Sequence, residues 1–191
     1  MTADDAPTGE PPARRPGASD DPAADGATTT GSARWSLLLA VAGIVLALDQ
    51  LTKAWAVDVL GDGHTIDLVG SLRLRLTLNY GSAFSLGDGR GPLISVLALV
   101  VVGILLRTGR NATRPSMAVA LGLVVGGAFG NLIDRAFRAG GGFLGGGVVD
   151  FIDLQWWPVF NLADSAIVVG ALALFALQWR EGEPRRDESH P

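Results

Sequence analysis

The apolar residues of this 191-residue chain are gathered into a few long runs, and this clustering limits what it can fold into. A helix needs roughly 20 mainly apolar residues to cross a bilayer. Three stretches reach that length, and a fourth, Pro92–Leu106, is nearly free of polar groups but short at about 1.5 Å of rise per residue, so it has to recruit flanking residues. The sequence predicts an all-α membrane protein with four transmembrane helices, at about residues 35–57, 91–107, 115–137 and 158–179.

The two ends of the chain differ in composition from this membrane domain, which we place at residues 34–180. Residues 1–33 are rich in Pro, Ala, Gly, Asp and Thr and carry much of the acidic excess behind the net charge of −4. They hold too few bulky apolar side chains to offset the entropy of ordering, so we expect a disordered N-terminal tail. A secretory signal peptide is disfavoured because the first apolar run has the length of a span. Residues 181–191 are expected to form a C-terminal tail.

Composition also excludes several classes of function. The chain has no cysteine and only two histidines, His64 and His190, so thiol, Ser-His and zinc-peptidase chemistry lack their residues. It has neither the basic patch of a nucleic-acid-binding protein nor a glycine-rich phosphate loop. We therefore expect no cofactor, no metal and no nucleic-acid partner.

The arginines next to the spans predict the orientation. Arg107, Arg110 and Arg114 lie between spans two and three, and Arg180 with two further arginines follows span four. Positive charge in short connections marks the cytoplasmic side. Both termini should therefore be cytoplasmic, and the connections at about 58–90 and 138–157 should face outward.

The two outer connections carry different patterns. Leucines alternate with polar residues from Leu72 to Asn79, which predicts a small β element between helices 1 and 2, its leucines facing lipid or the helix ends, or an ordinary hairpin packed on the protein. The second connection holds two glycine triplets, at 140–142 and 145–147, and should be mobile. It is either a flap near an active site or a plain linker.

Ionisable residues inside membrane spans are costly and are candidates for function. Span three runs outward and ends near Phe137, whereas span four runs inward from near Pro158. Their aspartates, Asp134 and Asp164, are therefore expected at similar depths near the outer face, where they could meet.

Other polar residues accompany this pair. Asp49 and Lys53 lie four residues apart on one helix face, so they form either a self-neutralising structural pair or a substrate contact. Asn131 and Asn161 each precede one of the aspartates by three residues and can donate hydrogen bonds to a carboxylate or hold a peptide carbonyl. Gly122, Gly126 and Gly130 form a strip on span three that favours close helix packing.

Two adjacent carboxylates can share a proton and act as acid and base, which is how aspartic peptidases activate water against an amide. The helix dipole favours the anion at Asp164, near the start of a helix, and disfavours it at Asp134, near the end of one. We expect Asp164 to start as the general base and Asp134 as the acid.

Five segments, in this order, resemble the signature blocks of the lipoprotein signal peptidase family, the bacterial signal peptidase II enzymes. The resemblance covers roughly residues 35–180. The segments are Asp49-Gln-Leu-Thr-Lys53, Asn79-Tyr-Gly-Ser-Ala-Phe84, Gly126-Gly-Ala-Phe-Gly-Asn-Leu-Ile-Asp-Arg135, Val149-Asp-Phe151 and Phe160-Asn-Leu-Ala-Asp-Ser-Ala-Ile167.

The resemblance implies an aspartyl endopeptidase of the bacterial cell membrane that cuts prolipoproteins just before a diacylglyceryl-modified cysteine. It implies that Asp134 and Asp164 are catalytic and that further residues bind substrate or support the site. It implies prolipoprotein and membrane lipid as partners, and we expect a monomer. The supporting residues are Asp49, Lys53, Asn79, Gly81, Asn131, Arg135, Asn161 and Ala163.

Two alternatives belong to other classes of protein. Paired intramembrane carboxylates also build ion relays in transporters, but those sites usually lie at the midplane between repeated halves, and this chain has no clear repeat. A structural subunit would use its polar residues only to hold helices together. It would not explain why both aspartates gather at one end.

Overall fold

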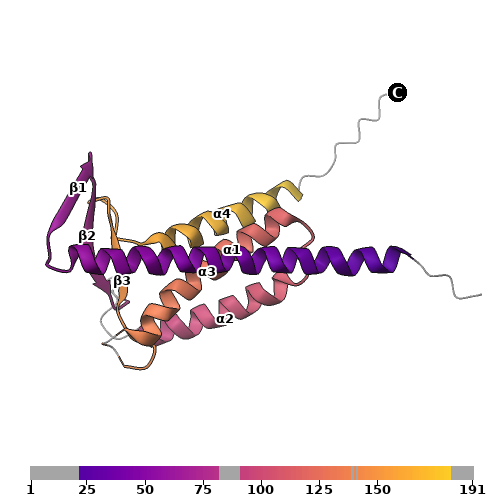
Figure 1. The fold of residues 1–191 in the computed structure, drawn as a ribbon, viewed down its shortest axis with the longest axis horizontal. Coiled ribbons are helices and arrows are strands. Elements are labelled where there is room, and N and C mark those ends of the chain that lie inside the picture. Colours follow the sequence, from indigo (N-terminus) through magenta and orange to yellow (C-terminus); the bar gives the residue numbers. More distant parts are fainter. Residues whose placement is uncertain (1–21, 82–90, 139, 141, 182–191) are drawn as a thin grey trace, which may run out of the picture.

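In the computed structural model, which describes residues 22–81, 91–138, 140 and 142–181, four long helices form a bundle (Figure 1). Each helix is long and apolar enough to cross a membrane. A small antiparallel sheet lies at one end of the bundle, and the described ends of the chain lie at the other (Figure 1). The helices are α1 (Pro22–Leu60), α2 (Gly91–Gly109), α3 (Pro115–Phe137) and α4 (Leu162–Glu181).

The helix bounds confirm four spans and correct two of their predicted starts. α3 has the predicted bounds, and α2 recruits flanking residues up to Gly109. α1 begins at Pro22, inside the stretch expected to be tail, where a proline at the first helical position and alanines favour a helix. α4 begins at Leu162 rather than near residue 158, because the backbone of Phe160 pairs with Ile152 instead.

The sheet has three strands, of which the alternating pattern predicted one, at residues 72–79. β1 (Thr65–Val69) and β2 (Leu72–Asn79) form a hairpin, which was one of the alternatives left open, and β2 has the bounds of the alternating pattern. β3 (Val148–Asp153) comes from the second connection and pairs with β2 across the chain. The sheet thereby joins both connections into one layer over the helix ends.

The packing of the β2 leucines shows whether they face lipid or the helix ends. Leu74 and Leu76 pack with buried Leu60 of α1 and with Val149 and Phe151 of β3. These leucines therefore face the helix ends. The sheet and the bundle share one apolar core, which fixes the height of β3 above the helices.

The glycine strip of α3 lies against α1 as predicted. A Cβ on Gly122 or Gly126 would lie within 3 Å of α1 backbone atoms, at Leu38 and Ala42 respectively. A Cβ on Gly130 would collide with the carboxylate of Asp49. The strip therefore brings the two backbones close enough for polar side chains of α1 to reach those of α3.

The described part of the glycine-rich connection is docked on the helices. The backbone N–H of Gly146 donates to the carbonyl of Arg135 at 3.0 Å, and the Ser95 hydroxyl donates to the carbonyl of Leu144 at 2.8 Å. A Cβ on Gly147 would lie 3.0 Å from the Tyr80 ring. These glycines permit close approach, while the predicted mobility of the connection stays a prediction.

Candidate active site

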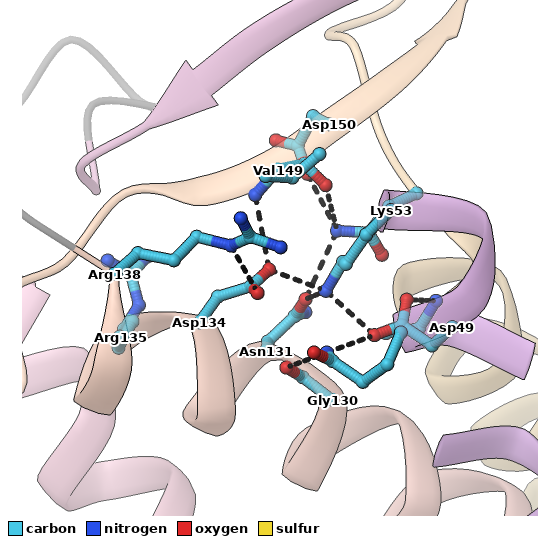
Figure 2. A network of polar contacts seen from close by, with 12 residues as sticks. Asp49, Lys53, Gly130, Asn131, Asp134, Arg135, Arg138, Val149 and Asp150 are labelled. Atoms are coloured by element: carbon cyan, nitrogen blue, oxygen red, sulfur yellow. Dashed lines mark hydrogen bonds and ion pairs between the residues drawn. The ribbon is translucent and has the colours of Figure 1, made fainter. Parts of the chain in front are cut away.

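Lys53, the only lysine of the chain, lies at the centre of a buried polar cluster where the bundle meets the sheet (Figure 2). Its side chain is fully buried. The Nζ atom lies 2.8 Å from Asp49 Oδ2, 2.9 Å from Asp134 Oδ2 and 2.9 Å from Asn131 Oδ1. An ammonium has three N–H donors, so these three acceptors from two helices use all of them.

Asp134 is held on both of its carboxylate oxygens. Oδ1 accepts from Arg138 Nε at 2.7 Å. Oδ2 takes the contact with Lys53 and also accepts from the backbone N–H of Val149 at 3.2 Å. Asp134 therefore ties α1, α3 and β3 together and fixes the strand backbone directly before Asp150 (Figure 2).

Asn131 has its amide oriented by these contacts. Its Oδ1 accepts from Lys53 and, at 3.1 Å, from Asn161 Nδ2. Its Nδ2 is therefore left to donate to Asp164 Oδ1, at 2.8 Å. The Asn131 amide therefore links Lys53 to Asp164.

Asp164 is fixed by the start of α4. The backbone N–H of Asn161 donates to Asp164 Oδ2 at 3.2 Å, and the backbone N–H of Asp164 donates to Asn161 Oδ1 at 2.9 Å. This is the reciprocal arrangement of a capping box, with Asp in place of the usual Glu. Asp49 Oδ1 accepts a further helix-end N–H, from Ala163, at 3.0 Å. The start of α4 and the Asn131 amide thus hold both carboxylate oxygens of Asp164 in place.

Asp150 of β3 faces the same place from the sheet and is 2% exposed. Oδ1 accepts from Asn161 Nδ2 at 2.7 Å, and Oδ2 accepts from Asn79 Nδ2 at 3.1 Å. Burial, followed by the nearby negative charge of Asp164, raises the pKa of Asp150 to about 7, against the lowering effect of the two amides. Near neutral pH the Asp150 carboxyl can therefore hold a proton.

A cavity of about 290 Å³ opens beside Asp150 and Asp164. It runs from these carboxylates and polar neighbours to an apolar end between α2, α3 and α4. Asp134 does not line it. The lining residues are Asn79, Gly81, Ile94, Ser95, Ala98, Ala128, Asn131, Leu132, Arg135, Val148, Asp150, Asp164 and Ile167.

Gly81 and Arg135 complete the polar part of the cavity. The backbone N–H of Gly81 donates to Asn79 Oδ1 at 2.9 Å, and Gly81 has a φ of 102°, which favours glycine. That contact leaves the Asn79 amide nitrogen turned toward Asp150. Arg135 Nη1 lies 3.4 Å from the carbonyl of Gly146, so its guanidinium stays at the cavity wall.

The charges of the cluster nearly cancel. Three cations, Lys53, Arg135 and Arg138, interact with its carboxylates. Within the ranges that the structure describes, no group of three or more His, Asp or Glu side chains is arranged to hold a metal ion. The four carboxylates belong to Asp49, Asp134, Asp150 and Asp164.

The structure brings the predicted site residues together at one end of the bundle but changes the pairing. Asp49 and Lys53 meet as predicted. Asn131, expected to serve Asp134 on its own helix, donates to Asp164 across the bundle instead. Both oxygens of Asp134 contact cations or a strand N–H, so the expected Asp134–Asp164 catalytic pair stays a prediction.

Two residues of the site were missed from the sequence. Asp150 was counted as part of an outer connection because only helical residues were assigned depths. Its signal was a single acid inside the β-branched and aromatic run Val148–Ile152, a pattern that predicts a buried strand. Arg138 has the acid-before-base spacing of four from Asp134, as Lys53 has from Asp49.

Comparison with known proteins gives consistent matches. The family profile described as "Signal peptidase (SPase) II" matches residues 41–180. A lipoprotein signal peptidase of Rhodococcus jostii is 49% identical over 142 residues, 74% of this chain and 71% of the relative. A lipoprotein signal peptidase of Mycolicibacterium smegmatis is 41% identical over 178 residues, which cover 93% of this chain and 73% of the relative. A solved bacterial membrane enzyme shares the fold, with a TM-score of 0.66 at 23% identity, covering 81% of this chain and 94% of that one.

Replacing Lys53 by Met should lower stability severely, because it leaves Asp49 and Asp134 buried without their shared cation. Loss of one partner from a buried ion pair costs about 3–5 kcal/mol. The check is the unfolding midpoint in detergent micelles. Adding Asp134→Asn to Lys53→Met should restore part of the loss, since one unpaired charge is removed. A Lys53→Met protein as stable as the parent would contradict the charge coupling.

Proposed function

The chain belongs to the signal peptidase II family, aspartic endopeptidases that remove signal peptides from lipoprotein precursors, and we propose that Asp150 and Asp164 are its catalytic pair. The observation that carries the proposal is that these two carboxylates, one from β3 and one from α4, line the same cavity. They are close enough for the charge of Asp164 to raise the pKa of Asp150. Family membership also sets aside the transporter and structural-subunit alternatives.

The two carboxylates are suited to different roles. Asp164 accepts N–H bonds on both oxygens at a helix N-terminus, so it is the base that takes a proton from water. Asp150 is the acid, because burial and the neighbouring charge of Asp164 raise its pKa to about 7, so that it keeps a proton near neutral pH. A shared proton between unlike sites is the arrangement that aspartic peptidases require.

The reaction then follows from these positions. The water oxygen attacks the carbonyl carbon of the scissile amide while Asp164 takes a water proton and Asp150 gives its proton to the carbonyl oxygen. When the C–N bond breaks, Asp164 returns its proton to the leaving amine and Asp150 recovers a proton from one hydroxyl of the tetrahedral intermediate, which becomes the carbonyl of the new acid. Asp134 and Lys53 take no part in these transfers; they position Asp150 and Asp164 through Val149 and Asn131.

The substrate proposed from the family resemblance is a diacylglyceryl-modified prolipoprotein, cut before its lipidated cysteine. The cavity supports this choice, since its polar end holds amide donors for a peptide and its other end is lined by Ile94, Ala98 and Ile167. We expect the enzyme to act as a monomer in the bacterial cell membrane.

Isosteric amides separate this pairing from the one first expected. Asp150→Asn and Asp164→Asn should each lower kcat/KM by about 10²–10⁴-fold, since each removes a proton-transfer group. Asp134→Asn should lower stability but keep clearly more activity than either. The measurement is cleavage of a lipidated prolipoprotein by purified enzyme in micelles. Normal turnover by Asp150→Asn together with an inactive, folded Asp134→Asn would restore the Asp134–Asp164 pair.

The pH profile should report the protonation of Asp150. Because its pKa is raised to about 7 and the protonated form is the acid, kcat/KM should fall as pH rises through about 7. Asn79 donates to Asp150 and lowers its pKa, so Asn79→Ala should move this alkaline limb to higher pH. Asn111→Ala, an exposed position in another connection, is the control. If the alkaline limb of the pH profile stayed at the same pH in Asn79→Ala, the fall in kcat/KM would have to be assigned to a group other than Asp150.

The sheet end of the bundle is proposed to face outward, with both termini cytoplasmic. The support is the arginine-rich connection at the opposite end. The chain has no cysteine, so a single exposed one in His64→Cys can report the side. An impermeant thiol reagent should label it in intact spheroplasts, whereas Asn111→Cys should react only after lysis. The reverse pattern would invert the topology.

A further inference from the structure

A second cavity, of about 480 Å³, adjoins the candidate active site. Its walls come from the connection between β3 and α4 and from the outer face of α4. Apart from Asp164 and Ser165 they are apolar. Its main lining residues are Trp156, Trp157, Phe160, Val168, Val169 and Asp164.

The two cavities meet at Asp164, which lines both. Ile167 continues the first cavity down α4, and Val168 and Val169 continue the second. Successive helical residues are rotated by about 100°, so these side chains occupy neighbouring faces of one helix. A substrate with its scissile bond at Asp164 can therefore send one arm into each cavity.

The tryptophan wall of the second cavity is held in place by polar contacts. Gln155 has a φ of 68°, a left-handed conformation that is uncommon for a side chain of this kind. Its backbone N–H donates to Asp153 Oδ1 at 2.7 Å, and its Nε2 donates to the carbonyl of Ser71 at 3.0 Å. Asp153 is bound in turn to Arg73 at 2.9 Å. The turn that presents Trp156 and Trp157 is thus anchored to the sheet.

The second cavity opens toward lipid rather than into the bundle. Trp156 is 71% exposed and Val168 is 56% exposed on the protein surface, and both belong to or border a membrane span. Paired tryptophans at a span end suit the headgroup layer, and the valines below them suit the acyl region. An alkyl chain can enter from the bilayer without crossing water.

We propose that this second cavity, lined by Trp156, Trp157, Phe160, Val168 and Val169, binds the acyl chains of the diacylglyceryl group while the first cavity takes the peptide. The inference rests on the proposed function, which places the lipidated cysteine directly after the scissile bond. The two arms of such a substrate differ as the two cavities do: the peptide needs amide partners, and the acyl chains need only apolar surface. The contacts at Asp164 then hold the bond at the junction.

The test fills the second cavity and varies acyl length. Val168→Trp should raise KM for a synthetic dipalmitoyl lipopeptide about 10-fold or more, because chain surface loses its apolar contacts. It should raise KM much less for the dioctanoyl analogue, and kcat should change little. Leu172→Trp, one turn deeper on α4 and similarly exposed but outside the cavity, is the matched control. Equal effects on both chain lengths, or equal effects of both variants, would overturn the proposal.

Photocrosslinking tests the acyl site apart from catalysis. A lipopeptide with diazirine-bearing acyl chains should label Trp156, Trp157 or Val168 in the Asp164→Asn variant, with unlabelled lipopeptide competing. A diacyl phospholipid with the same chains should label these positions far less at equal mole fraction. Equal labelling by the two would mean that the cavity takes bilayer lipid only. If labelling is specific but no variant or parent cleaves, the acyl site stands and the proposed function fails.

Discussion

The buried ammonium of Lys53 is the contact on which the functional end of this molecule depends. Three acceptors meet it, and they come from α1 and α3, whose backbones approach closely only because α3 presents glycines at Gly122, Gly126 and Gly130. An ammonium removed from water is stable only when fully paired. Satisfying it fixes two carboxylates and one amide, and each of these then sets the position of something else.

These contacts explain how the sheet contributes a residue to the candidate active site. Asp134 holds the backbone of β3 at Val149, and the Asn131 amide reaches Asp164 on α4. The positions of β3 and of the start of α4 therefore both depend on contacts with Lys53. Asp150 and Asp164 belong to segments that share no regular hydrogen-bond ladder, yet their separation is set by rigid elements on either side. Such support is what a pair of proton-transfer groups needs, because small displacements cost rate.

Sequence patterns were informative where local rules decide and misleading where a long-range pairing decides. Pro115 and an apolar run were enough to bound α3, and alternating leucines were enough to bound β2. The predicted depth of Asp134 does not show which groups contact its carboxylate, and in the structure these are Arg138 and Lys53. Asp150 enters the site only because β3 pairs with a strand some 70 residues earlier, as in the Asn79–Asp150 contact. The spacing of residues along the sequence does not predict that β2 and β3 pair.

The chain's single lysine has a practical side as well. Lys53 is 0% exposed, and no other side chain of this sequence carries a primary amine. Amine-directed reagents, including the usual esters for dyes, crosslinkers and surface coupling, therefore find no side-chain target while the bundle is closed. Acylation of Lys53 requires that the polar core open. The rate of acylation would therefore measure how often this part of the bundle opens in the membrane.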